Sequence, residues 1–181
     1  EQAQPWIANF ERRLDAMLYA VQARLPGGCE IFLANIYDPT DGLGDAHSAG
    51  LPAWPDAMRI LAAYNSILER TATKRANVHL VNLHNAFLGH GIHCRQFWRR
   101  FYRTDDPHYW YHENLEDPNE RGYDALRRLF LIEMAKQYFP AHSAGAFDDA
   151  RLKLVIGDGV AFVNETNERF DVVISDSTDP Y

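Results

Sequence analysis

Two short apolar stretches, each preceded by a helix-like segment, constrain the fold of this chain more than any other feature. The runs "CEIFLANIYDP" and "NVHLVNLH" are apolar over consecutive residues rather than at every second one. Strands of that kind are typical of parallel sheets that are buried on both faces. Residues 5–25 and 55–73 carry apolar side chains at three- and four-residue steps, as amphipathic helices do. The order helix, strand, helix, strand predicts an α/β fold in which helices cover a parallel sheet.

The remaining segments continue this pattern. Residues 39–54 are rich in Gly, Pro and Asp and predict a loop, and residues 84–118 show no regular period. A long helix is expected from Asn119 to about residue 137, ended by Pro140. Residues 152–180 predict a strand, a Gly-Asp-Gly turn, a short helix and a second strand.

Composition limits the classes of function. The chain has 181 residues, 46% of them hydrophobic, and a formal net charge of -7. It is long enough for one sizeable core, and its acidity argues against binding to nucleic acid or to an anionic membrane. Cys29 and Cys94 show no disulfide or zinc spacing, so we expect reduced thiols and a cytoplasmic location. No apolar run reaches the roughly 20 residues that span a bilayer, and no signal peptide is visible.

The most specific motifs lie near the C-terminus. "IGDG" follows one apolar stretch, and "SDSTDP" follows the next. With these two motifs, residues 138–180 closely resemble the central part of spermidine synthases, which are polyamine aminopropyltransferases. The resemblance implies a Rossmann-like segment, with ligands bound beyond the carboxyl ends of its strands.

The same resemblance implies a role for four residues. Asp158 and Gly159 would bind decarboxylated S-adenosylmethionine, a co-substrate rather than a tightly bound cofactor, and Asp158 would accept a hydrogen bond from the adenine amino group. Asp176 would be the catalytic base that removes a proton from the amine, and Asp179 would bind the cationic polyamine substrate. A lone Asp at either position would more simply be a turn or capping residue.

Two parts of that family's pattern are absent ahead of residue 138. Neither the Gly-rich loop at the first Rossmann strand nor the acidic ribose ligand after the second strand appears there. Glu133 lies near the position of the ribose ligand, but it falls within a continuous helical pattern and is expected to be an exposed helical carboxylate. We therefore expect the chain to be inactive as an aminopropyltransferase on its own.

Residues 5–133 resemble the C-terminal half of an SGNH (GDSL-type) hydrolase. The matching stretches are "IFLANIYDPTDG", "AYNSIL", "VHLVNLHNAFLGHG" and "DPNERGYDALRR". The resemblance implies a flavodoxin-like sheet and an ester hydrolase. However, the Ser, Gly and Asn blocks are absent, and Asn114 and Asp117 stand where the family has its catalytic Asp and His. Because a carboxyl cannot replace an imidazole near neutral pH, we expect no esterase activity from this chain.

Three further clusters lie in the irregular region. His90, His93 and Cys94 are crowded like metal ligands, but a fourth ligand cannot be placed, so we expect loop and core side chains and no metal site. A displaced catalytic imidazole among His84, His108 and His112 is a minor alternative. The run "FWRRFYR" mixes aromatic and basic side chains, but the acidic residues after it argue against nucleic-acid stacking.

The two resemblances meet inside one predicted helix without a Pro-, Gly- or Ser-rich linker. We expect a hydrolase-like part over residues 1–137 and a partial aminopropyltransferase segment over residues 138–181. A natural fusion fragment, a chimera, and a divergent protein in which one resemblance is wrong all remain open, as does a non-catalytic folded fragment. Incomplete sheets leave uncovered edges, so a homo-oligomer is also expected.

Overall fold

The computed structural model describes residues 3–143, 145–155 and 159–172, with the backbone alone for residues 142, 143, 159 and 160. The chain divides into two compact units, Glu1–Ala144 and Gly145–Tyr181.

The described part of the first unit contains one sheet of two parallel strands, β1 (Ile31–Ala34) and β2 (Val78–Val81). Ile31 pairs with Val78 and Ala34 pairs with Val81. The α/β class and the parallel pairing are as the sequence predicts. Alternate side chains of β1 pack into different clusters, since Leu33 lies against one core and Phe32 against the other.

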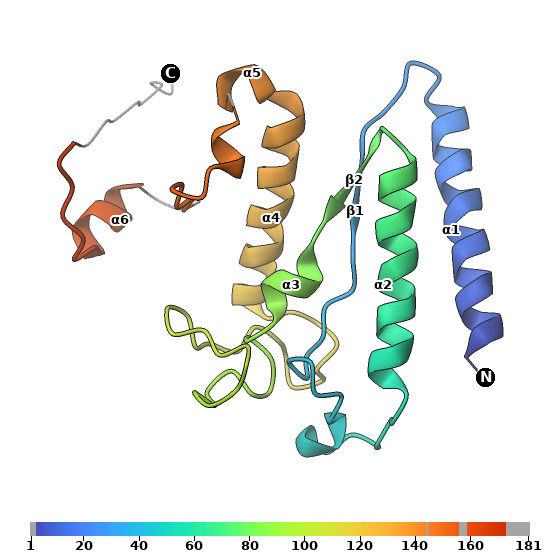
Figure 1. Cartoon of the computed structure of the whole chain (residues 1–181), viewed down its shortest axis with the longest axis horizontal. Coiled ribbons are helices and arrows are strands. Elements are labelled where there is room, and N and C mark those ends of the chain that lie inside the picture. Colours follow the sequence, from blue (N-terminus) through green and yellow to red (C-terminus); the bar gives the residue numbers. More distant parts are fainter. Residues whose placement is uncertain (1–2, 144, 156–158, 173–181) are drawn as a thin grey trace. The chain divides into compact units, whose positions relative to one another are not determined.

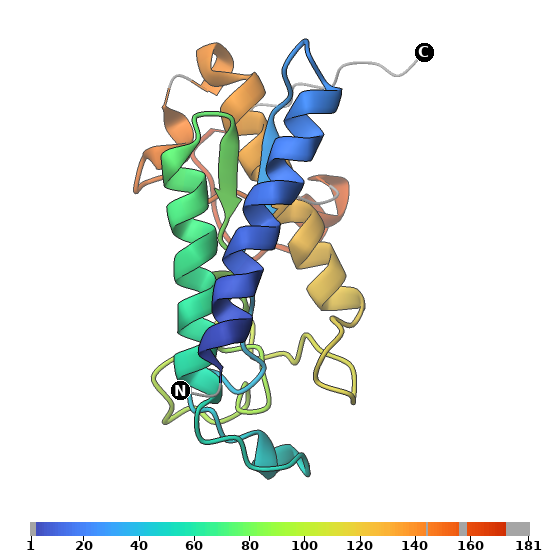
Figure 2. The same ribbon diagram turned by 90° about the vertical axis from the view of Figure 1, so that its right-hand side faces the viewer.

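Helices α1 (Gln4–Arg24) and α2 (Ala57–Lys74) cover one face of this sheet (Figures 1 and 2). Their apolar stripes meet in one core cluster, in which the fully packed members are Ile7, Leu14, Leu18, Ile67 and Leu68. Both helices match the predicted ranges within two residues, because a period of three to four apolar residues is a local property of the sequence.

Helix α4 (Glu120–Tyr138) covers the opposite face of the sheet (Figures 1 and 2). Asn119 caps its start, because the Asn119 side-chain oxygen accepts hydrogen bonds from the backbone N–H groups of Arg121 and Gly122. Its inner side packs on a second cluster built around Val81, Leu83, Phe87 and Tyr111. The long helix expected from Asn119 is confirmed.

Short elements complete the first unit. Helix α3 (Leu83–Phe87) begins directly after β2, where the sequence predicted a continued strand, and Asn82 caps it by accepting a bond from Asn85 N. The predicted loop contains a 3-10 turn, η1 (Ala46–Ala49). Pro140 follows the end of α4, as expected, and also begins the short helix α5 (Pro140–Ser143). The sequence did not predict α5.

The second unit contains η2 (Ala146–Asp148) and α6 (Gly159–Glu165). The short helix after the Gly-Asp-Gly turn is confirmed. The strand predicted before that turn is wrong over its described residues, because residues 152–155 form none. The apolar residues of this stretch are 43% to 49% exposed, namely Leu152, Leu154 and Val155. A buried strand needs a hydrogen-bonded neighbour, and no strand lies in the described part of this unit.

Among the described helices, none is both long and apolar enough to cross a membrane.

Candidate functional site

The acidic residues predicted to bind substrate and co-substrate lie outside the described residues. This applies to Asp158, Asp176 and Asp179. Gly159 is the first residue of α6, and only its backbone is described. The roles expected for these four residues therefore stay predictions.

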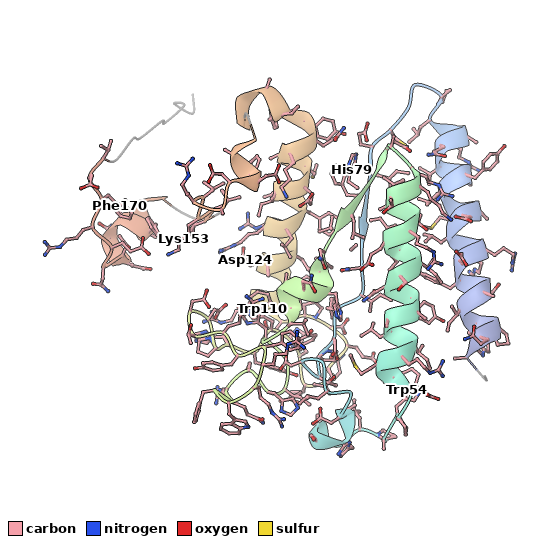
Figure 3. The ribbon with its side chains drawn as sticks, in the orientation of Figure 1. Trp54, His79, Trp110, Asp124, Lys153 and Phe170 are labelled. Carbon is pink, nitrogen blue, oxygen red and sulfur yellow. The ribbon has the colours of Figure 1, made fainter. Side chains whose placement is uncertain are left out.

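The described residues around the turn place the segments before and after α6 side by side. Lys153 Nζ lies 2.6 Å from Glu168 Oε1, although fifteen residues separate them. In the same unit, the ring centroids of Phe162 and Phe170 lie 6.2 Å apart. Figure 3 labels Lys153 and Phe170 within this unit. The chain thus doubles back after α6 and returns beside the residues that precede the turn.

Glu133, which lies near the position of the missing ribose ligand, is part of α4. Its carboxylate Oε1 lies 3.0 Å from Lys136 Nζ, one helical turn further on, and its side chain is half-buried rather than fully exposed. The prediction of a helical carboxylate is confirmed, with an ion pair in place of full exposure.

A second polar region lies at the carboxyl ends of β1 and β2. Asn35 Nδ2 donates to Asn82 Oδ1 at 3.0 Å, and Asn35 Oδ1 accepts from His84 N at 2.8 Å. Asn65 of α2 bonds both the N–H and the carbonyl of Ile36. These side-chain amides form hydrogen bonds within the protein, and the bonds hold the chain in place where it leaves the sheet.

Asp41 is a buried carboxylate in the loop after β1. Its Oδ1 accepts hydrogen bonds from Gly89 N at 2.8 Å and Gly91 N at 2.9 Å, and its Oδ2 accepts one from His93 N at 3.1 Å. Burial raises the pKa of Asp41, and the three backbone bonds only partly oppose that effect. Asp41 therefore joins the loop after β1 to the loop that follows α3.

The same two loops are joined by a buried imidazole. His93 Nε2 lies 3.0 Å from both carboxylate oxygens of Asp45, and Ser48 Oγ donates to Asp45 Oδ2 at 3.1 Å. Burial acts to raise the pKa of Asp45, but the hydrogen bonds from His93 and Ser48 lower it overall. His93 Nδ1 is buried and has no hydrogen-bond partner in the described part of the chain.

His90 and Cys94 are buried next to this network. The His90 ring stacks on Trp110 with 3.5 Å between centroids, and His90 Nδ1 bonds the His108 carbonyl at 3.1 Å. Trp110 is labelled in Figure 3, in the loop region below α4. Burial lowers the pKa of His90 and raises the pKa of the Cys94 thiol. His90, His93 and Cys94 are thus buried loop and core side chains, as predicted.

A shallow hollow of about 410 Å³ lies beside this network, with Ser48, Gly91, Cys94, Arg95 and Tyr109 in its wall. Within the described ranges, no group of three or more His, Cys, Asp or Glu side chains is arranged to hold a metal ion.

The hydrolase-like closing loop forms a turn. Asn114 Nδ2 donates to Asp117 Oδ2 at 2.9 Å, and Asn114 Oδ1 accepts from the N–H groups of Glu116 and Asp117. Neither side chain contacts an imidazole in the described hydrogen bonds. His84 bonds a backbone carbonyl and His108 pairs with Asp106, so neither is placed as a displaced catalytic base for this loop.

The network of Asp41, Asp45 and His93 was missed by sequence reasoning. A signal existed, because "DPTDGLGD" follows a buried strand and combines acidic residues with glycines. What the sequence could not give was the partner, since the bonds from Asp41 reach residues 48 to 52 positions further along the chain.

Comparison with known proteins locates the clearest similarity at the C-terminus. The Spermine/spermidine synthase domain matches residues 130–181, which is less than a third of the chain. The polyamine aminopropyltransferase of Yersinia pestis (strain Pestoides F) is 55% identical over 69 residues, or 38% of this chain and 22% of that protein. The polyamine aminopropyltransferase of Yersinia pseudotuberculosis serotype O:3 (strain YPIII) gives the same values. No solved structure matches.

The chain therefore matches only about a fifth of the length of these curated relatives. The matched domain begins inside α4, which runs without interruption from Glu120 to Tyr138. These comparisons do not support the resemblance of residues 5–133 to SGNH hydrolases.

Proposed function

We propose that residues 138–181 carry the co-substrate and amine-recognition part of an aminopropyltransferase. The observation that carries the proposal is the 55% identity to polyamine aminopropyltransferases, together with a matched domain that contains both "IGDG" and "SDSTDP". The helix that begins at Gly159, and the return of the chain from α6 to Lys153, suit a turn that would present Asp158 to a ligand.

The proposed chemistry assigns each acid one task. Asp158 accepts a hydrogen bond from the adenine amino group of decarboxylated S-adenosylmethionine. Asp179 binds the cationic polyamine, and Asp176 removes a proton from its attacking nitrogen. The nitrogen lone pair then forms a bond to the aminopropyl carbon, the carbon–sulfur bond breaks toward sulfur, and methylthioadenosine leaves.

On its own, the chain is proposed to bind without efficient turnover. The family's Gly-rich loop is absent from the sequence ahead of residue 138, and Glu133, the nearest candidate for the ribose ligand, is held in an ion pair with Lys136. A partial pocket of this kind retains the adenine contact and loses the contacts that orient the sulfonium for transfer.

Calorimetry on the whole chain tests this proposal. Methylthioadenosine should give a measurable heat of binding, and its affinity should fall about tenfold or more in Asp158→Asn. Asp171→Asn, four residues before the second motif, should bind like the parent chain. Absence of any heat in a folded parent chain would leave a non-catalytic scaffold. Rapid release of methylthioadenosine from decarboxylated S-adenosylmethionine and putrescine would instead contradict the predicted inactivity.

Ester hydrolysis, the second hypothesis, has no comparable support. Ser48, Asp45 and His93 do lie in one hydrogen-bonded chain, but the hydroxyl of Ser48 donates to the carboxylate and not to the imidazole. A serine nucleophile needs its own base within hydrogen-bond reach. We expect no hydrolysis of a p-nitrophenyl ester, and activity that is lost in Ser48→Ala would contradict this reading of the geometry.

A further inference from the structure

Helix α1 has a second apolar stripe beside the one that it buries. Ile7, Leu14 and Leu18 face α2 in the core. Trp6 and Met17 remain 70% and 54% exposed. One helical turn is about 3.6 residues, so Trp6, Phe10, Arg13 and Met17 lie along one line on the helix surface. In Figure 2 this helix faces the viewer, and no other helix or strand of the first unit lies over it.

This second stripe borders a groove of about 570 Å³, whose wall includes Trp6, Phe10, Arg13, Met17 and Tyr64. The rings of Phe10 and Tyr64 meet edge to face with 4.7 Å between their centroids, which fixes one wall of the groove. Arg13 forms no hydrogen bond or ion pair among the described residues, unlike Arg12, which bonds Asn9. Arg13 is exposed to solvent. An occupant that covered this groove would therefore need both apolar surface and a group that attracts a guanidinium.

The stripe is complementary to itself when it is reversed. In an antiparallel pair of α1 helices centred between residues 11 and 12, Trp6 of one copy faces Met17 of the other, and Phe10 faces Arg13. The first pair is a sulfur–aromatic contact and the second is a cation–π contact.

We propose that this face of α1, defined by Trp6, Phe10, Arg13 and Met17, binds a second copy of the chain in an antiparallel arrangement. Every contact then occurs twice, as a two-fold symmetric interface requires. A purely apolar occupant would cover Arg13 without compensating its lost hydration. The second copy supplies the Phe10 ring at that place.

Sedimentation velocity on the whole chain, from about 1 to about 100 µM, tests the proposal. The parent chain should pass from monomer to dimer over this range. Trp6→Ala and Arg13→Glu should each weaken the dimer by about tenfold or more. Tyr19→Ser is the matched control, because Tyr19 is 75% exposed and lies two residues from Met17, on the opposite side of the helix. Its dimer should be unchanged.

Crosslinking tests the register. In a background with Cys29 and Cys94 replaced by Ala, a mixture of Trp6→Cys and Met17→Cys chains should be joined by a short bis-maleimide. Either variant alone should give little dimer, because equal positions lie far apart in an antiparallel pair. A parent chain that stays monomeric at about 100 µM would overturn the proposal. So would a dimer that is unaffected by Trp6→Ala and Arg13→Glu, or equal crosslinking in the single-variant samples.

Discussion

Lys153 and Glu168 form an ion pair with 2.6 Å between Nζ and Oε1, and this pair joins the segment before the Gly-Asp-Gly turn to the segment after α6. The two side chains are 71% and 50% exposed. The contact therefore shows where the chain runs more than it stabilises that course, since solvent screens an exposed pair strongly.

Removing this ion pair should change stability very little. For Lys153→Met we expect the free energy of unfolding to change by less than about 1 kcal/mol. The change should be smaller at high salt than at low salt. Urea unfolding at low and high ionic strength measures it. A loss of several kcal/mol would mean that the pair is far less accessible to water than its exposure indicates.

Asp41 should contribute measurably to the stability of the first unit. In Asp41→Asn one carboxylate oxygen becomes an amide N–H₂ group that faces backbone donors, so buried N–H groups lose their acceptor. We expect the free energy of unfolding to fall by about 2 to 3 kcal/mol. Asp105→Asn is the matched control, because Asp105 is exposed. Equal effects of the two substitutions in urea unfolding would contradict this role.

The carboxyl of Asp41 should also make the free energy of unfolding depend on pH. Because burial raises its pKa above the ordinary 3.8, the folded chain binds a proton that the unfolded chain has already lost. The contribution of Asp41 to stability is therefore largest below 3.8 and falls as the pH rises through the folded pKa. Asp41→Asn should remove that component from the curve of unfolding free energy against pH, and a curve of unchanged shape would contradict the assignment.

His90 should make the fold less stable in mild acid. Burial lowers its pKa below 6.5, so below that pH the unfolded chain binds a proton that the folded chain does not. The free energy of unfolding should then fall with decreasing pH by at most about 1.4 kcal/mol per pH unit, until the folded pKa is reached. His90→Gln should flatten this slope, whereas His112→Gln, at an exposed position, should keep it. A slope that persists in His90→Gln would assign it to another group.

Gly89 should tolerate no side chain. Its φ of 94° favours glycine, and a Cβ atom would lie 2.0 Å from the Phe101 carbonyl oxygen. We expect Gly89→Ala to lower the free energy of unfolding by at least about 3 kcal/mol. Gly27→Ala is the control, since nothing lies within 4 Å of a Cβ atom there. Circular dichroism during urea unfolding measures both, and similar midpoints would contradict the close approach.

Local periodicity explains what the sequence predicted well. The apolar steps of α1, α2 and α4 are contained within each helix, so their ranges could be read directly. The parallel pair of β1 and β2 followed from the alternation of helices with buried strands. The hydrogen bonds to Asp41 join loops that are distant in the sequence. The strand expected at residues 152–155 needed a neighbouring strand, and the described part of its unit has none. Neither is a property of a short window of sequence.

The most direct test of the central claim is an exchange of the matched segment. Residues 130–181 would replace their counterparts in the Yersinia pestis polyamine aminopropyltransferase, and release of methylthioadenosine from decarboxylated S-adenosylmethionine and putrescine would be measured after circular dichroism confirms folding. We predict activity within about tenfold of the parent enzyme and its loss in Asp176→Asn. A folded but inactive exchange protein, or full activity in Asp176→Asn, would contradict the proposal that this segment carries aminopropyl-transfer chemistry.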